Sequence, residues 1–145
     1  MTTIAPTVNG QVIGLAHYAG RAVLESVLAL HGATFQQQIT LNRVTGGPVE
    51  RDALAEEVAD ALKVGPAEIQ GVVDELIAKG LLAAEASQVR LTDTGKTFHA
   101  EVSAEVGGIS ARLYAGIPAE DLTAAGRVLT QVTERANAEL AARRS

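Results

Sequence analysis

The stretch from Pro48 to Leu82 constrains the fold of this chain most strongly, because it predicts two short helices joined by a tight turn. The first helix is expected to end at Lys63-Val64-Gly65. Pro66 suits the opening of the second helix, since its fixed φ fits a first turn whose amide has no partner within the helix. Gly80 can adopt the left-handed conformation that ends a helix. The apolar residues at helical spacing are Leu54, Val58, Ala61 and Leu62 in the first helix and Ile69, Val72, Val73 and Leu76 in the second. Two such helices with a Gly-containing turn predict a helix-turn-helix unit.

The residues behind the second helix predict a β-hairpin. A short β-compatible segment follows Leu81-Leu82, Ser87-Gln88 forms a polar tip, and Val89-Arg90-Leu91 provides the returning strand. Thr92 to Lys96 then opens a long helix. A hairpin directly behind a helix-turn-helix unit is a wing.

This series of elements resembles the MarR family of winged-helix transcription regulators, and the resemblance covers nearly the whole chain. The matching motifs are a helix ending Leu-x-x-Lys-Gly-Leu-Leu and, after the hairpin, Leu-Thr-x-x-Gly. In this sequence they are Leu76, Lys79, Gly80, Leu81, Leu82, Leu91, Thr92 and Gly95. The resemblance implies a mainly α fold with a small β wing, in which residues 1–145 form one MarR-like domain. Residues of about 8–32 and 93–145 would be the helical dimerisation region, and about 34–92 the winged helix-turn-helix lobe.

The flanking segments are predicted to be helical and carry more apolar surface than a small winged lobe would cover. The helices are expected from about Gly10 to His31, from Phe35 to about Val44 with Thr34 as N-cap, from Thr92 to about Tyr114, and from Pro118 to about Ala142. Gly107-Gly108 predicts a bend or the close approach of another helix. A homodimer would bury the surplus apolar surface, and two-fold dimers are the commonest oligomers. A monomeric helical bundle is the alternative.

Composition favours one globular domain in a reducing compartment. The chain has 145 residues, of which 47% are hydrophobic and 20% charged, and it has no Cys. The N-terminal residues lack a basic start followed by an apolar run, and no stretch approaches about 20 uncharged apolar residues. We therefore expect a cytoplasmic protein without a membrane span.

The outward face of the second helix is the predicted reader of DNA bases. Winged-helix regulators place this helix in the major groove. Gln70 can pair with adenine through two hydrogen bonds, and Glu68 can accept one from cytosine. The candidate DNA-binding residues, including basic groups for phosphates, are Arg43, Arg51, Lys63, Ala67, Glu68, Gln70, Gly71, Arg90 and Lys96.

Two features of the same region count against strong DNA binding. The family pattern has Ser or Thr followed by Arg where this chain has Gln70-Gly71, and the short tip Glu85–Gln88 lacks the family's Asp-x-Arg signature. Between Pro48 and Leu82, three basic residues stand against eight acidic ones, a net charge of −5. Phosphate contacts from Lys and Arg supply most non-specific affinity for DNA.

His17 and Arg21 lie one helical turn apart among apolar residues and could hold the acid or phenol group of a small ligand. The resemblance implies such an effector, a small anionic aromatic molecule, and Tyr18 and Phe35 could line the same cavity. The alternative is that Arg21 pairs with Glu25 on the surface while His17 belongs to the core.

The sequence predicts no catalytic site, metal site or cofactor. The three histidines are scattered, and no phosphate loop or nucleophile elbow occurs. We therefore expect a homodimeric regulator of MarR type that acts as a repressor, binds a palindromic double-stranded DNA operator and responds to a small ligand. The alternative is a winged-helix dimer with weakened DNA binding that serves as a ligand-binding or protein-interaction module.

Overall fold

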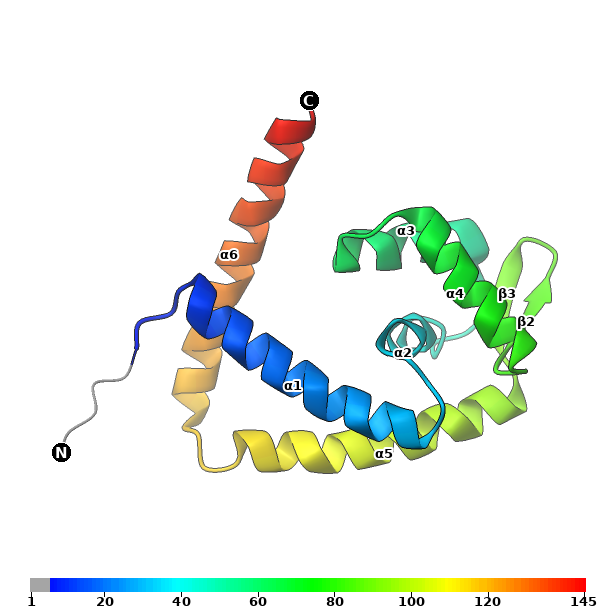
Figure 1. The fold of residues 1–145 in the computed structure, drawn as a ribbon, viewed down its shortest axis with the longest axis horizontal. Helices are drawn as coiled ribbons and strands as arrows, with labels where there is room; N and C mark the ends of the chain where they lie inside the picture. The colour runs from blue at the N-terminus through cyan, green and yellow to red at the C-terminus, as the bar shows by residue number, and fades with distance from the viewer. Residues whose placement is uncertain (1–5) are drawn as a thin grey trace. The chain divides into compact units, whose positions relative to one another are not determined.

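The computed structural model describes residues 6–145, which form helices and a small antiparallel sheet (Figure 1). The helices are α1 (Gly10–Leu30), α2 (Phe35–Asn42), α3 (Arg51–Leu62), α4 (Pro66–Ala78), α5 (Asp93–Tyr114) and α6 (Ala119–Arg144). The strands are β1 (Val49–Glu50), β2 (Leu82–Glu85) and β3 (Gln88–Leu91). The chain divides into two compact units at Gly108, within α5, and each unit is described by itself. The predicted fold class, mainly α with a small β wing, is confirmed.

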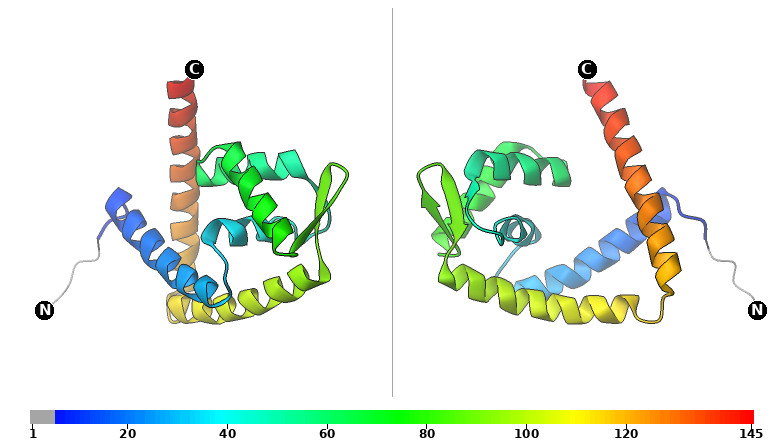
Figure 2. Two further views of the ribbon diagram at one scale, coloured as in Figure 1. Left: turned by 45° about the vertical axis from the view of Figure 1, so that its right-hand side comes forward. Right: turned by 180° about the vertical axis from the view of Figure 1, so that it is seen from behind.

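The first unit contains a lobe built from α2, α3, α4 and the three strands (Figure 2). The strand order is β1-β3-β2, with Val49 opposite Val89 and Leu82 opposite Leu91. The lobe core contains all four predicted apolar residues of α4. Its buried members are Leu41, Val44, Leu54, Ala55, Val58, Ala59, Ile69, Val72, Val73, Leu76, Leu81, Leu82, Val89 and Leu91. The helix-turn-helix prediction is therefore correct in its elements and in the buried face of α4. In α3, Leu54 and Val58 are buried as predicted, whereas Leu62 is half-buried and Ala61 is exposed, because Ala55 and Ala59 turn toward the core instead.

Local signals in the sequence account for the helix ends. Thr34 and Gln37 form a reciprocal capping box at the start of α2. At the end of α4, Gly80 has φ +75° and the amide of Leu81 donates to the carbonyl of Leu76 at 3.0 Å. This bond pattern is the glycine helix stop predicted for Gly80. Lys63 ends α3 in the left-handed conformation, with φ 58°.

The Leu-Thr-x-x-Gly segment joins the hairpin to α5 through contacts that require its residue types. The Thr92 hydroxyl donates to the carbonyl of Gly80 at 2.6 Å and accepts from the amide of Gly95 at 2.9 Å. A Cβ placed on Gly95 would lie 2.1 Å from the carbonyl oxygen of Leu81. Thr92 thus caps the helix, and only glycine allows α5 to start this close to the end of α4.

The α1 helix leaves most of its apolar surface uncovered within the single chain. Only Val27 and Leu28 are buried, whereas Leu15 is 67% and Leu30 80% exposed. By length and composition alone, α1 could cross a membrane. This is weak evidence for a membrane span, because core helices of soluble proteins meet the same criteria. Its Arg21 and Glu25 form an ion pair with an N–O distance of 3.0 Å.

The second unit contains the end of α5, a turn at Gly116, and α6. None of the 26 residues of α6, all of which the structure describes, is buried. Leu122, Val128, Leu129 and Val132 are its exposed large apolar side chains. Gly107-Gly108, where a bend or a close helix approach was predicted, does not break α5, which is one continuous helix from Asp93 to Tyr114.

Candidate nucleic-acid interface

The α4 helix presents a solvent-exposed face opposite its buried stripe. Ala67, Glu68 and Gly71 on this face are exposed, whereas Gln70 is half-buried. A Cβ on Gly71 would meet no atom within 4 Å, so internal packing does not require glycine there. Glycine within a helix costs about 0.5–1 kcal/mol relative to alanine. The small side chains at positions 67 and 71 leave space for a partner to approach the helix backbone.

Gln70 is held between two residues at the start of α3. The Arg51 Nε donates to the Gln70 Oε1 at 2.6 Å, and the Gln70 Nε2 donates to the Asp52 Oδ1 at 2.9 Å. One Arg51 nitrogen, Nη2, also donates to the backbone oxygen of Gln70 at 3.2 Å and to the Asp74 Oδ1 at 2.7 Å. Arg51, predicted as a phosphate contact, is therefore engaged with the α4 surface, and its side chain is only 28% exposed.

Three further predicted phosphate contacts form ion pairs within the lobe. Arg43 pairs with Glu57, Lys63 with Asp60 at 3.5 Å, and Arg90 with Glu85 at 2.8 Å. Lys96 has no ion pair within 4 Å among residues 6–145. Pairs at exposed positions contribute little stability and are screened by salt. Their main effect is to reduce the positive charge that the lobe presents.

The wing is short, and its tip is fixed to α3. Ala86 and Ser87 form the whole loop between β2 and β3, and Ala86 has φ 53°. The backbone oxygen of Ser87 accepts from the amide of Arg51 at 2.9 Å. The tip therefore lies beside the start of α3.

Arg90 and Lys96 line one hollow of about 250 Å³ at the base of the wing. The loop Thr45–Pro48 and Leu91 complete its wall. This arrangement brings together two of the predicted phosphate-binding residues.

Three of the four predicted ligand-binding residues line a second hollow, of about 320 Å³, between α1, α2 and the end of α3. These are His17, Arg21 and Phe35, together with Gln36, Ala61, Leu62 and Val64. The Arg21 guanidinium lies 4.1 Å from the centre of the Phe35 ring, a cation–π contact. Tyr18 is 69% exposed, lies edge-on to the His17 ring and is not among the lining residues. The alternative prediction is half correct: the Arg21–Glu25 surface pair is present, but His17 is exposed and does not belong to the core.

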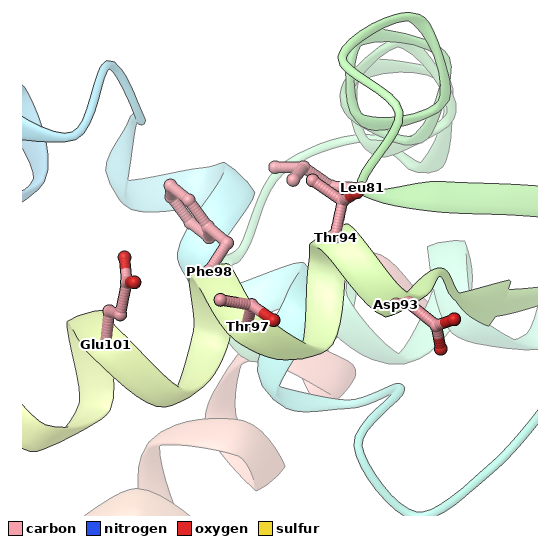
Figure 3. Close-up of a pocket in the computed structure, with 6 residues that line it drawn as sticks. All are labelled: Leu81, Asp93, Thr94, Thr97, Phe98 and Glu101. Atoms are coloured by element: carbon pink, nitrogen blue, oxygen red, sulfur yellow. The ribbon is translucent and has the colours of Figure 1, made fainter.

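Another hollow, of about 450 Å³, lies along the first turns of α5 (Figure 3). Leu81 and Phe98 provide its apolar wall, whereas Asp93 and Glu101 place carboxylates at its two ends. Its acidic rim disfavours an anionic ligand. Among residues 6–145, no three His, Asp or Glu side chains lie close enough to hold a metal ion together.

The sequence did not reveal the acids that bind the predicted DNA-contacting residues: Asp74 binds Arg51, and Asp52 binds Gln70. It also did not reveal the contact between the His31 ring, at the end of α1, and the Glu105 carboxylate of α5, at 3.0 Å. These partners lie on different elements, and no pattern of local spacing identifies them.

Comparison with solved structures identifies the fold. CouR from Rhodococcus jostii RHA1 bound to p-coumaroyl-CoA is similar at 20% identity and TM-score 0.72, over 85% of this chain and 89% of that one. A Mycobacterium tuberculosis MarR family protein in complex with DNA is similar at 20% identity and TM-score 0.68, over 88% of this chain and 98% of that one. MarR from E. coli, in its reduced form, gives 20% identity and TM-score 0.66, over 90% of this chain and 95% of that one.

No protein-family model and no curated protein sequence matches the chain. Identity near 20% combined with these TM-scores supports a shared architecture. The chain therefore has the winged-helix fold of the MarR-family transcription regulators.

Proposed function

We propose that this protein is a homodimeric, cytoplasmic transcription regulator of MarR type that binds a palindromic DNA operator as a repressor. The observation that carries this proposal is the outward face of α4 on a winged helix-turn-helix lobe, where Ala67, Glu68 and Gly71 are exposed and Gln70 is half-buried. In winged-helix and related proteins, this helix enters the major groove. A similar M. tuberculosis MarR family protein has been solved in complex with DNA, which supports DNA binding by this chain.

Phosphate contacts would come first from Lys96 and Arg90 at the base of the wing. Lys96 has no acidic partner among residues 6–145, and Arg90 uses its Nε for Glu85. Arg43 and Lys63 would contribute by exchanging an exposed carboxylate for a phosphate, and rising salt weakens such contacts. Glu68, Ala67 and Gly71 complete the proposed major-groove face.

The dimer would bury the apolar residues that a single chain leaves exposed. These lie on α1, at the end of α5 and on α6: Leu15, Tyr18, Val23, Leu30, Leu113, Tyr114, Leu122, Val128, Leu129 and Val132. Exposed apolar residues gathered on one element commonly mark an interaction surface. Two-fold symmetry would place two α4 helices on half-sites about one DNA turn apart.

The proposed effector is a small aromatic acid held in the hollow of His17, Arg21 and Phe35. A cation beside an aromatic ring suits a ligand that has both a carboxylate and a flat apolar body. The similar M. tuberculosis protein has been solved with salicylic acid, and CouR with p-coumaroyl-CoA. Binding between α1 and the lobe would change the lobe's position and release DNA.

A gel-shift titration tests the proposal directly. The probe is the DNA upstream of the protein's own gene, with a scrambled duplex of equal length as control, at salt concentrations from about 50 to 200 mM. We expect tighter binding to the upstream DNA and weaker binding as salt rises. Equal affinity for both duplexes would contradict an operator-binding function.

The acidity of the lobe favours a second candidate, a winged-helix module that binds a ligand or protein in place of DNA. Eight acidic residues between Pro48 and Leu82 oppose three basic ones, and Arg51 and Lys63 among these form ion pairs. Lys79, the third, donates to the carbonyl of Gly32 at 2.6 Å. Absence of any gel shift at 50 mM salt, with a folded dimer, would favour this module.

A further inference from the structure

We infer that Arg51 is a positioning residue that fixes the Gln70 carboxamide in the orientation that reads adenine. The inference rests on the proposed DNA-binding function and adds to it a determinant of sequence preference. It reassigns Arg51 from the phosphates, where the sequence placed it, to the base-reading side chain.

The chemistry of the neighbours determines which way the carboxamide points. Arg51 can only donate and the Asp52 carboxylate can only accept hydrogen bonds. The Gln70 oxygen must therefore face Arg51, at 2.6 Å, and its nitrogen must face Asp52, at 2.9 Å. A flipped carboxamide would set N–H against N–H and oxygen against carboxylate. The orientation is thus assigned by charge and does not depend on distinguishing oxygen from nitrogen.

Both carboxamide atoms keep one further hydrogen-bonding capacity. The oxygen has a second lone pair, and the nitrogen has a second hydrogen. An acceptor beside a donor is the complement of adenine, which offers the N6 amino group and the N7 acceptor in the major groove. Without the two neighbours, the carboxamide could flip and donate to guanine instead.

Two other contacts keep Arg51 in place. Its Nη2 bonds the backbone oxygen of Gln70 and the Asp74 carboxylate, so the guanidinium spans more than one turn of α4. The guanidinium is planar and presents its donors in a rigid fork, which resists rotation once two acceptors are engaged. Gln70 is half-buried, and the exposed Ala67 and Gly71 beside it add no bulk that would keep a base away from the accessible part of its side chain.

The experiment selects binding sites from a pool of duplexes randomised over 24 base pairs, roughly two DNA turns, and compares base preferences among variants. Arg51→Met removes the positioning contacts. Arg143→Met is the control, because it removes the same charge from an exposed position in the last turn of α6 that is not part of the proposed DNA interface. Asp52→Ala, with Glu56→Ala as its control, releases the carboxamide from the other side by a substitution at an exposed position.

We expect the wild type and both controls to prefer adenine about fivefold or more at one position in each half-site. Arg51→Met and Asp52→Ala should each lose the adenine preference. In a protein that already carries Gln70→Ala, adding either substitution should leave the base preference unchanged. If Arg51→Met fails to fold, the base preference of Asp52→Ala tests the inference on its own. Retention of the adenine preference in Asp52→Ala or in a folded Arg51→Met would overturn the inference. DNA binding by the wild type with no adenine preference would also overturn it, while leaving the proposed function intact; no DNA binding at all would overturn both.

Discussion

At the scale of single residues, two helical glycines have opposite structural roles. A Cβ on Gly95 would collide with the carbonyl of Leu81, whereas a Cβ on Gly71 would enter open space. We predict that Gly95→Ala lowers the free energy of unfolding by about 1–3 kcal/mol through overpacking. Gly71→Ala should raise it by about 0.5–1 kcal/mol, because alanine favours the helix. Urea denaturation measures both, and equal effects of the two substitutions would contradict this account.

The stability gained by Gly71→Ala should carry a functional cost. If DNA approaches the α4 backbone at this position, the added methyl group weakens specific binding while the protein becomes more stable. We expect a loss of affinity in gel shifts with the selected operator. An unchanged affinity would show that Gly71 does not lie against DNA.

Arg90 and Gln70 should affect DNA binding in different ways. Arg90→Ala removes a phosphate contact, so we predict weaker binding to all sequences and a decrease of about 1 in the slope of log affinity against log salt. Gln70→Ala removes a base contact and should change which sequence is preferred. Gel shifts with operator and scrambled duplexes separate the two effects. Unchanged affinity and preference in both variants would count against the proposed docking.

At the scale of helices and strands, periodicity and caps were sufficient to predict the lobe. The stripe of α4, the stop at Gly80 and the cap at Thr92 each depend on residues within a few positions of one another, and all three occur in the structure. The ion pairs could not be predicted in this way. Arg51 and Asp74 meet because α3 packs against α4, and many acids on these helices were equally available from the sequence.

The hollow between α1, α2 and α3 gives a prediction at the same scale. Arg21 stacks on Phe35 and pairs with Glu25, so its charge is already partly compensated. We predict that Arg21→Ala weakens binding of salicylate, measured by isothermal titration calorimetry. Glu25→Gln should strengthen it, because the guanidinium loses its competing carboxylate. Equal salicylate affinity in both variants would place the ligand elsewhere.

At the scale of the whole molecule, charge and apolar surface are distributed unequally along the chain. The segment Pro48–Leu82 carries a net charge of −5, equal to that of the entire protein. The exposed large apolar residues instead concentrate on α1, the end of α5 and α6. This separation agrees with a charged lobe that meets solvent or DNA and helices that meet a second copy.

The exposed apolar residues of α6 allow the proposed dimer to be tested without altering the lobe. We predict that the double substitution Leu129→Glu and Val132→Glu converts a dimer, of twice the 15.0 kDa chain mass, into a monomer, because it buries unpaired charge in an apolar contact. Gln131→Glu adds a charge to the same exposed helix without removing an apolar residue and should leave the dimer intact. Size-exclusion chromatography with light scattering measures the mass.

The monomer should also bind the palindromic operator far more weakly, since each lobe then binds its half-site alone. A wild type that is monomeric, or a double variant that remains dimeric, would show that this face of α6 does not join two chains.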